Sequence, residues 1–373
     1  MSQWIKTKLG EIVILNYGKA LKAQDRNAGS IPVYSSGGLT GWHNKALINE
    51  QGIIIGRKGT VGKAYLTYGP FWCIDTAYYI LPNPSKYDFV FLFYLLKTLG
   101  LEELNEDSAV PGLNRDTAYS QEILLPSLPE QKAIASVLSS LDDKIDLLHR
   151  QNKTLESMAE TLFRQWFILD STGVSVSIDQ IIDFNPKRTL IKSQDATYLD
   201  MAGLSTVIFR ANGYYRRPFS SGTKFTKRDT LLARITPCLE NGKAAYIDFL
   251  DDNETGWGST EFIVMRPKKE IHPFISYIMC RNPDFKEYAE SCMEGSSGRQ
   301  RVNLDHLKKF NVNLPTEASL RIINELLDSF ESKLINNSKQ IDSLEKLRDT
   351  LLPKLMSGEV RVQYAEEAIA SVA

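Results

Sequence analysis

The sequence predicts an α+β protein in which two homologous α/β lobes are separated by a pair of long helices that form an antiparallel coiled coil. Three observations predict this pseudo-two-fold fold: a gap-free internal repeat, heptads in both repeated segments, and the same order of strand-like and helix-like runs before each segment. The predicted parts are a first lobe at 1–125, a first long helix at 126–170, a second lobe at 171–315, a second long helix at 316–358 and a tail at 359–373.

The repeat is clearest where each lobe ends. Leu125-Pro126 recurs 189 residues later as Leu314-Pro315, and the same spacing then continues without a gap. The matched apolar positions are Leu138, Leu141, Ile145 and Leu155 against Leu327, Phe330, Leu334 and Leu344. The lobes match only in outline, for example at Asn16 and Asn185 near their starts. The helices are therefore the more similar part of the repeat.

Both repeated segments show the alternating steps of four and three residues that are typical of a coiled coil. The inward positions of the first segment are Ile134, Leu138, Leu141, Ile145, Leu148, Asn152, Leu155, Ala159, Leu162 and Trp166. Those of the second are Ile323, Leu327, Phe330, Leu334, Asn337, Ile341, Leu344, Arg348, Leu351 and Leu355. Each series contains one asparagine, and we predict an Asn152–Asn337 contact that sets the register of the pair. The alternative is two slightly exposed polar positions.

Each lobe carries short apolar runs that indicate strands, followed by a run with helical period. In the first lobe the strand-like runs are Gly52–Gly56 and Tyr78–Leu81, and the helical run is 88–104. In the second lobe the corresponding runs are 230–235, 262–265 and 273–290. This shared order predicts two homologous α+β domains.

The composition, with 43% hydrophobic and 24% charged residues, is ordinary for a globular protein. No apolar run is long enough to cross a membrane, and the first residues lack the apolar core of a signal peptide. The four cysteines are scattered without a CxxC pair, which argues against a disulfide framework or a zinc site and favours a reducing, cytoplasmic location. Lys and Arg exceed Asp and Glu by one in 1–125 and by three in 175–315, so the basic excess lies in the lobes.

Polar, Gly-rich loops at matching places in the two lobes carry the donors that phosphate contacts and base-edge readout require. The candidate DNA-binding residues of the first lobe are Ser36, Arg57, Lys58, Thr60, Asn114 and Arg115. Those of the second lobe are Arg216, Arg217, Arg234, Ser297, Arg299, Gln300 and Arg301. Arg57-Lys58 and the 296–301 loop are the strongest candidates, because several donors converge there. Such loops are also common on any protein surface.

Motifs for chemistry are absent from the sequence. There is no phosphate-binding G-x-x-x-x-G-K-[ST] loop, and Asn282-Pro283-Asp284-Phe285 lacks the second proline of an adenine amino-methyltransferase motif. The histidines His43, His149, His272 and His306 are far apart and are more typical of packing or surface positions than of a ligand set. We therefore predict no catalytic, cofactor-binding or metal-binding residues in this chain.

The whole chain resembles the specificity (S) subunits of type I restriction–modification systems. The resemblance rests on the segment from Leu124 to Ile134, which reads LLPSLPEQKAI, and on Val312-Asn313-Leu314-Pro315, each followed by heptads. It also rests on the lobe opening at Leu9–Ile12 and on Ser357–Val362 near the C-terminus. The second junction departs from the pattern, since no Glu-Gln pair follows Pro315.

This resemblance implies a non-catalytic DNA-specificity subunit whose lobes are target-recognition domains, each for one half of a bipartite, asymmetric sequence in double-stranded DNA. It implies that the helices act as a spacer and dock two methyltransferase subunits and, in the full complex, restriction subunits. S-adenosylmethionine, ATP and Mg²⁺ would act in those partners. Two alternatives remain open: a coiled-coil scaffold whose lobes bind protein or glycan, and a methyltransferase with degenerate motifs.

Overall fold

The computed structural model describes residues 4–104, 112–170, 172–296 and 298–363. The chain divides into two compact units, one made of Met1–Asp146 with Gln340–Ala373 and the other of Leu147–Lys339. Each unit therefore combines one lobe with one half of each long helix. None of the helices that the structure describes has the length and the apolar character needed to cross a lipid bilayer.

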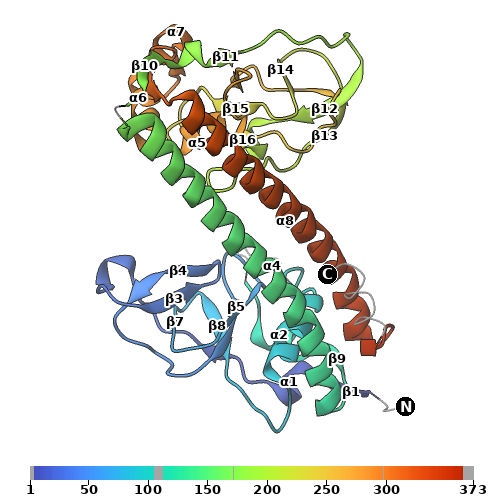
Figure 1. The fold of residues 1–373 in the computed structure, drawn as a ribbon. Coiled ribbons are helices and arrows are strands. Elements are labelled where there is room, and N and C mark those ends of the chain that lie inside the picture. The colour runs from blue at the N-terminus through green and yellow to red at the C-terminus, as the bar shows by residue number, and fades with distance from the viewer. Residues whose placement is uncertain (1–3, 105–111, 171, 297, 364–373) are drawn as a thin grey trace. The chain divides into compact units, whose positions relative to one another are not determined.

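The first unit contains the first lobe, whose core is a mixed set of short sheets and helices (Figure 1). Its four-stranded sheet has the order β2 (Asn16–Tyr17), β8 (Ala77–Ile80), β5 (Gly52–Gly56), β6 (Ala64–Thr67). A three-stranded sheet has the order β4 (Gly38–His43), β3 (Ile31–Ser35), β7 (Trp72–Cys73), and β1 (Ile5–Lys8) pairs with β9 (Glu122–Leu125). The helices are α1 (Leu9–Ile12), α2 (Phe89–Thr98) and α3 (Arg115–Tyr119), with a 3₁₀ turn η1 at Ala23–Asp25.

The second unit contains the second lobe and repeats this plan. Its first four-stranded sheet has the order β11 (Ile182–Phe184), β18 (Phe262–Pro267), β15 (Thr230–Ala233), β16 (Ala244–Tyr246). The other has the order β13 (Tyr215–Pro218), β12 (Asp195–Leu199), β17 (Thr255–Gly258), β14 (Thr223–Thr226). The remaining pairs are β10 (Val174–Ser177) with β21 (Asn311–Leu314) and β19 (Met293–Glu294) with β20 (Arg301–Val302). The helices are α5 (Phe274–Arg281), α6 (Pro283–Ser291) and α7 (Leu304–Leu307), with 3₁₀ turns η3 (Ile178–Gln180) and η4 (Met201–Gly203).

The two lobes share their sheet topology, which confirms the predicted α+β fold with an internal repeat. The order β2-β8-β5-β6 in the first lobe corresponds to β11-β18-β15-β16 in the second, and every neighbouring pair in both sheets is antiparallel. Strand β5 is buried along its whole length because all five residues of Gly-Ile-Ile-Ile-Gly face packed neighbours. The predicted strand-like runs are therefore the central strands of each sheet.

The single helical run predicted at 273–290 is wrong, since it forms two helices. Asn282 has an extended backbone (φ −68°, ψ 129°), and its side chain accepts hydrogen bonds from the N–H groups of Asp284 and Phe285. Pro283 is the first residue of α6, where its missing N–H costs nothing. The Asn-Pro pair therefore ends α5 and begins α6, although the apolar period continues through it.

The predicted long helices are α4 (Leu128–Phe163) and α8 (Glu317–Ser357), of 36 and 41 residues. A π-helical segment η2 (Arg164–Leu169) follows α4. Within each unit the two helices run antiparallel and bury their heptad positions (Figure 1). The buried positions include Ile134, Leu138, Leu141, Ile145 and Leu148 of α4, and Ile323, Leu327, Leu334, Ile341, Leu344, Leu351 and Leu355 of α8.

The two seam asparagines are in contact in the second unit. Asn337 is fully buried, and its Nδ2 donates to Asn152 Oδ1 at 2.9 Å and to Gln151 Oε1 at 3.3 Å. Asn152 Nδ2 in turn donates to Ser338 Oγ at 3.3 Å. The expected contact is thus present, and its role in setting the register stays a prediction, because a buried amide favours the one alignment that pairs it.

Arg348 occupies a heptad position of α8 in the first unit, and its charge is paired there. Its Nη1 lies 2.9 Å from Asp142 Oδ1 on α4, and Tyr94 of α2 donates its hydroxyl to Asp142 Oδ2 at 2.6 Å. Asp142 therefore connects both helices to the first lobe. The position that corresponds to Asp142 in the repeat, 189 residues later, is Glu331.

Candidate nucleic-acid interface

Three segments of the first lobe meet at the carboxyl end of β5. The backbone N–H groups of Arg57 and Lys58, the two residues after β5, both donate to the carbonyl oxygen of Thr76. The N–H of Leu113 donates to the carbonyl oxygen of Arg57 at 2.8 Å, and Lys58 forms an isolated antiparallel bridge with Gly112. The loops after β5, before β8 and before α3 are thereby joined by backbone hydrogen bonds, which holds their side chains in fixed relative positions.

The same end of the sheet contains an open pocket of about 350 Å³ with a basic, aromatic lining. The guanidinium carbon of Arg57 lies 4.9 Å from the ring centre of Tyr17, and that of Arg115 lies 5.4 Å from it. Lys58 also lines the pocket, and among the described residues that line it Asp116 is the one acid. The pocket is therefore positively charged, and the ring of Tyr17 holds the two guanidinium groups without neutralising them.

Ser36 and Thr60, also predicted from the sequence, do not line this pocket but lie near the same end of the sheet. The N–H of Ser36 donates to Thr76 Oγ1 at 3.3 Å, so the 35–38 turn is joined to the segment before β8. A side chain at Gly56 would overlap the carbonyl oxygen of Thr60, which explains why the loop that contains Thr60 can fold back over the end of β5. Asn114 begins α3, where its side chain accepts a hydrogen bond from the N–H of Asp116. All six residues predicted in the first lobe thus lie around one end of the sheet.

The second lobe repeats the backbone pattern at the carboxyl end of β15. The N–H of Arg234 donates to the carbonyl oxygen of Glu261, and the N–H of Val302 donates to the carbonyl oxygen of Arg234. Ile235 forms an isolated antiparallel bridge with Arg301. By these hydrogen bonds Arg234 corresponds to Arg57, Glu261 to Thr76, and Arg301 to Gly112.

The side chains at this second site differ from those of the first. Arg301 makes a two-point ion pair with Glu261, with Nη2 2.6 Å from Oε1. These hydrogen bonds lower the pKa of the Glu261 carboxyl. The guanidinium of Arg234 turns inward and donates to the carbonyl oxygen of Val302. Gln300 is anchored through its backbone to Thr236, and Arg299 is exposed, while Ser297 lies outside the described residues.

Arg216 and Arg217 lie on β13, in the other sheet of the second lobe, and no contact between described residues joins them to Arg234 or Arg301. Arg216 is paired with Asp195 at 2.7 Å and with Glu254 at 3.4 Å, and its hydrogen bond to Asp195 is the main cause that raises its pKa. Arg217 is exposed and lies 5.1 Å from the ring centre of Tyr198 and 5.6 Å from that of Trp257. Of the two, Arg217 is the one without a carboxylate partner among the described residues.

Sequence reasoning missed Tyr17 and Glu261. Tyr17 ends the short strand β2, and Glu261 directly precedes β18, so each lies far along the chain from the loops that it supports. Only the strand pairings β2–β8 and β15–β18 bring them to those loops. For Glu261 a usable signal was its position directly before the predicted strand run 262–265, since residues that border central strands meet at one end of a sheet.

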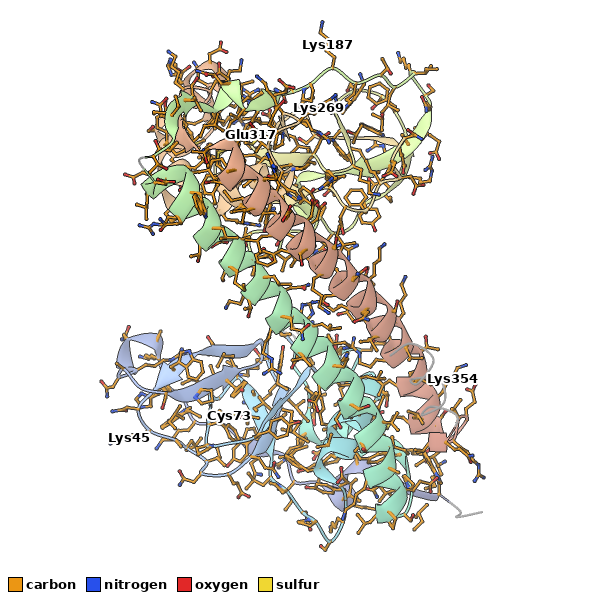
Figure 2. All side chains as sticks on the ribbon, in the orientation of Figure 1. Lys45, Cys73, Lys187, Lys269, Glu317 and Lys354 are labelled. Atoms are coloured by element: carbon orange, nitrogen blue, oxygen red, sulfur yellow. The ribbon has the colours of Figure 1, made fainter. Side chains whose placement is uncertain are left out.

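A second group of basic residues lies near the opposite ends of β15 and β18 and contains Arg228, Arg266 and Lys268, together with Lys269, which is labelled in Figure 2. Arg266 forms an ion pair with the fully buried Asp229, and Arg188 also contacts that carboxylate. Arg228 is paired with Glu331 of α8 at 2.6 Å. Because carboxylates inside the protein already neutralise these arginines, this end is the weaker candidate for DNA.

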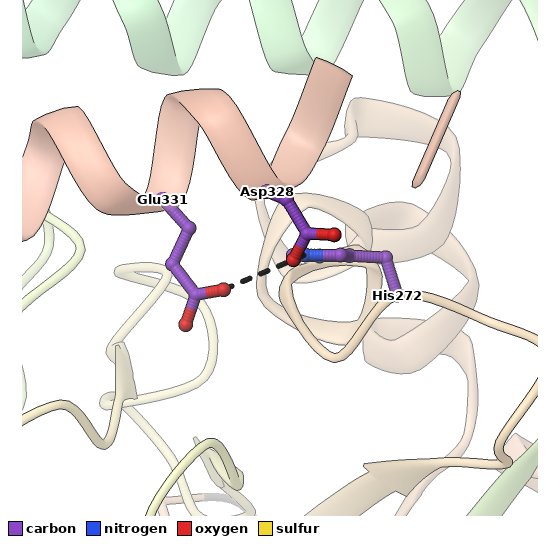
Figure 3. A group of neighbouring side chains, drawn as sticks. All are labelled: His272, Asp328 and Glu331. Atoms are coloured by element: carbon purple, nitrogen blue, oxygen red, sulfur yellow. Dashed lines mark hydrogen bonds and ion pairs between the residues drawn. The ribbon is translucent and has the colours of Figure 1, made fainter. Parts of the chain in front are cut away.

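His272, Asp328 and Glu331 point toward one another, and their ligand atoms lie close enough to hold a metal ion (Figure 3). Arg228 already supplies a cation there, since its Nη2 lies 2.6 Å from Glu331 Oε2 and 3.1 Å from His272 Nε2. His272 Nδ1 accepts from the N–H of Phe274, so Nε2 carries the proton and donates to Asp328 Oδ1 at 2.9 Å. Burial lowers the pKa of His272 and keeps the ring neutral. We interpret this group as an ion-pair network that fastens the second lobe to α8.

Comparison with known proteins decides the family. The model of the type I restriction modification DNA specificity domain matches residues 1–157 and 172–346, one copy for each half of the repeat. The chain belongs to this family. Its members are non-catalytic DNA-recognition components of type I restriction enzymes, as the sequence resemblance implied.

Individual relatives are distant but cover much of the chain. The type I restriction enzyme MjaIX specificity subunit of Methanocaldococcus jannaschii is 27% identical over 319 residues, which are 73% of this chain and 69% of that protein. The HindI specificity subunit of Haemophilus influenzae is 21% identical and covers 78% and 81%. The EcoEI specificity subunit of Escherichia coli is 26% identical over 51% of this chain, and the match spans only 34% of that longer relative.

Among solved structures, the type I restriction–modification S subunit from M. genitalium has a TM-score of 0.64 at 19% identity and covers 95% of this chain and 96% of its own. At this identity the likeness shows that the specificity-family fold is shared.

Proposed function

We propose that this specificity-family chain binds a bipartite, asymmetric sequence in double-stranded DNA, with each lobe reading one half. The observation that carries the proposal is the pair of equivalent sheet ends, which share their backbone hydrogen bonds and differ in their side chains. One scaffold with two different sets of donors is what two readers of unlike half-sites require.

At the two sheet ends, some basic residues would contribute affinity for DNA and others would select the base sequence. Lys58, Arg115 and Arg299 are exposed and suit phosphate contacts, which are sequence-independent and weaken as salt concentration rises. Arginines held in one orientation by the protein suit base edges, because bidentate readout needs a fixed plane. Arg57 and Arg301 are the best examples, since each has a side-chain or ring partner that orients it.

We further propose that α4 and α8 act as a spacer and dock two methyltransferase subunits, with restriction subunits joining in the full complex. Large apolar side chains remain exposed on both helices of the second unit: Leu147 and Met158 on α4, and Ile322 and Leu326 on α8. Exposed apolar positions on otherwise buried heptad helices favour a protein partner over DNA. In this proposal S-adenosylmethionine, ATP and Mg²⁺ act in the partner subunits.

The test is to express the chain with its methyltransferase partner and to map the methylated adenines in cellular DNA. A bipartite motif is the expected result, and exchanging residues 171–315 for those of another specificity subunit should change only one half of it. A swap that changed both halves, or neither, would contradict the assignment of one lobe to each half. Purified chain should also be retained on duplex DNA in a salt-sensitive way, and retention on protein or glycan alone would favour a scaffold.

A further inference from the structure

The ion pair between Arg301 and Glu261 leaves one edge of the guanidinium available. Nε lies 3.0 Å from both carboxylate oxygens of Glu261, and Nη2 lies 2.6 Å from Oε1. The Nε–Nη2 edge is therefore occupied. No other side-chain partner of Arg301 occurs among the described residues, so the Nη1–Nη2 edge presents its donors to solvent, and the side chain is 56% exposed.

The backbone of Arg301 is also fixed in place, by strand pairing on both sides. Arg301 pairs with Glu294 across β19 and β20, and it bridges Ile235 on the other side. The next residue, Val302, is fully buried and donates its N–H to Arg234. Because both ends of the side chain are positioned before any ligand arrives, little conformational entropy remains to be lost on binding.

The ligand that fits this edge is a pair of adjacent acceptors in one plane. In the major groove of DNA, guanine presents two acceptors, N7 and O6, side by side. Adenine replaces the second acceptor by an amino donor, which would face a guanidinium N–H without a hydrogen bond. A phosphate also offers two acceptors, but a carboxylate beside the arginine would be repelled by it.

We propose that Arg301, positioned by Glu261, reads a guanine in the half-site of the second lobe. This inference rests on the proposed function and adds the base that one residue selects. Glu261 is a positioning residue, since it acts through the arginine. The first lobe has Gly112 and Thr76 at the corresponding places, so it lacks this arginine–glutamate pair.

The experiment uses the full chain with its methyltransferase partner and compares Arg301→Lys, Arg301→Gln and Glu261→Gln with the unmodified chain. The readouts are the methylated motif and competition binding to duplexes in which single base pairs are replaced. Lysine keeps the charge but loses the planar, two-point geometry. We expect Arg301→Lys to lower the preference for guanine at one position of the second half-site by roughly 5- to 140-fold, with the first half-site unchanged.

Arg301→Gln should shift the preference at that position toward adenine, because glutamine pairs with N6 and N7 of that base. Glu261→Gln should weaken the guanine preference at the same position by a smaller factor, and Glu261→Asp should restore part of it. The matched control is Arg299→Lys, two residues away on the same loop, whose side chain has no carboxylate partner among the described residues. Because Arg299 is proposed to contact phosphate, this variant can change the overall affinity, but the relative preference among bases should stay the same at every position.

Three results would overturn the inference: a second half-site without a G·C pair, an unchanged guanine preference in both Arg301 variants, or an Arg299 variant that alters the motif in the same way. These differ from a failure of the proposed function, in which the unmodified chain directs no methylation to a bipartite sequence. Thermal unfolding of each variant shows whether it folds. Arg301 is exposed and Glu261 is partly exposed, and a Gln at either place keeps its polarity, so the Gln variants should fold normally.

Discussion

The two lobes present the same backbone at the ends of β5 and β15 but different chemistry. In the first lobe Arg57 and Arg115 lie over the ring of Tyr17 beside an open pocket. In the second lobe Arg301 is paired with the carboxylate of Glu261, and the residue that corresponds to Tyr17 is Pro186. Aromatic contact orients an arginine without occupying its N–H donors, whereas a two-point ion pair sets its plane and occupies one edge of the guanidinium. The two halves of the repeat therefore share a backbone arrangement at these ends and differ in the side chains that it carries.

The attachment of each lobe to the helices differs in the same way. Asp142 in the first unit and Glu331 in the second occupy corresponding positions, and each accepts a hydrogen bond from a tyrosine of its lobe. The arginine that completes the ion pair comes from α8 in the first unit but from the lobe itself, as Arg228, in the second. An acid at this position is thus retained while its partners are replaced.

The largest expected effect comes from removing that acid in each unit. Glu331→Ala leaves Arg228 and the buried hydroxyl of Tyr246 without their main partner, so we expect a loss of about 3 kcal/mol in the stability of the second unit. Asp142→Ala should cost the first unit about 1.5 kcal/mol, because Asp142 is more exposed. Hydrogen exchange of β15 and β5 peptides measures the two units separately. Equal losses, or a loss in the wrong unit, would show that the attachments do not differ as described.

A pH dependence is expected in the second unit from Glu156 of α4. Burial raises the pKa of Glu156 to about 7, against the hydrogen bond from Tyr277 and the charge of Arg281, and Glu160 adds to the rise. A carboxyl whose folded pKa is raised stabilises the fold at acidic pH, and that stability is lost as pH increases from about 4.5 to 7.

Glu156→Gln removes this dependence. The unfolding free energy of the variant relative to the unmodified chain should rise by on the order of 2 kcal/mol across the pH range of the shift, as measured by denaturant unfolding at several pH values. His272, whose pKa is lowered, contributes stability that grows with pH, but it does so equally in both proteins and cancels in the difference. A flat difference between pH 4.5 and 7 would contradict the expectation.

The smallest effect concerns the aromatic ring of the first lobe. Tyr17→Ala leaves every charge in place but removes the surface that orients Arg57 and Arg115, so we expect affinity for duplex DNA to fall about two- to fivefold. The salt dependence of binding should not change, since no cation is lost. Tyr68→Ala is the control, because Tyr68 is 72% exposed and does not line the pocket. An equal effect in both variants would remove the special role of Tyr17.

Much of the candidate interface could be predicted because the loops that follow the central strands lie together at one end of the sheet. Arg57, Lys58 and Arg115 in the first lobe, and Arg234 and Arg301 in the second, were predicted from their loops and lie at equivalent ends. The pairing of Arg216 with Asp195 could not be predicted, since it depends on the alignment of β12 with β13. Which N–H groups of an arginine a neighbouring carboxylate occupies, and which it leaves available to a ligand, depends on strand pairing, and sequence spacing does not report that.

The long helices, their apolar seam and the duplication were determined by the sequence alone, because heptad periodicity acts through neighbours three and four residues apart. The contact of Asn152 with Asn337 followed from the same local rule. Only the tertiary structure decided which arginines keep N–H groups available for a ligand and which are neutralised by carboxylates. Glu261 and Tyr17 reach their arginines through strand pairing, and the residues that meet in this way are far apart in the chain.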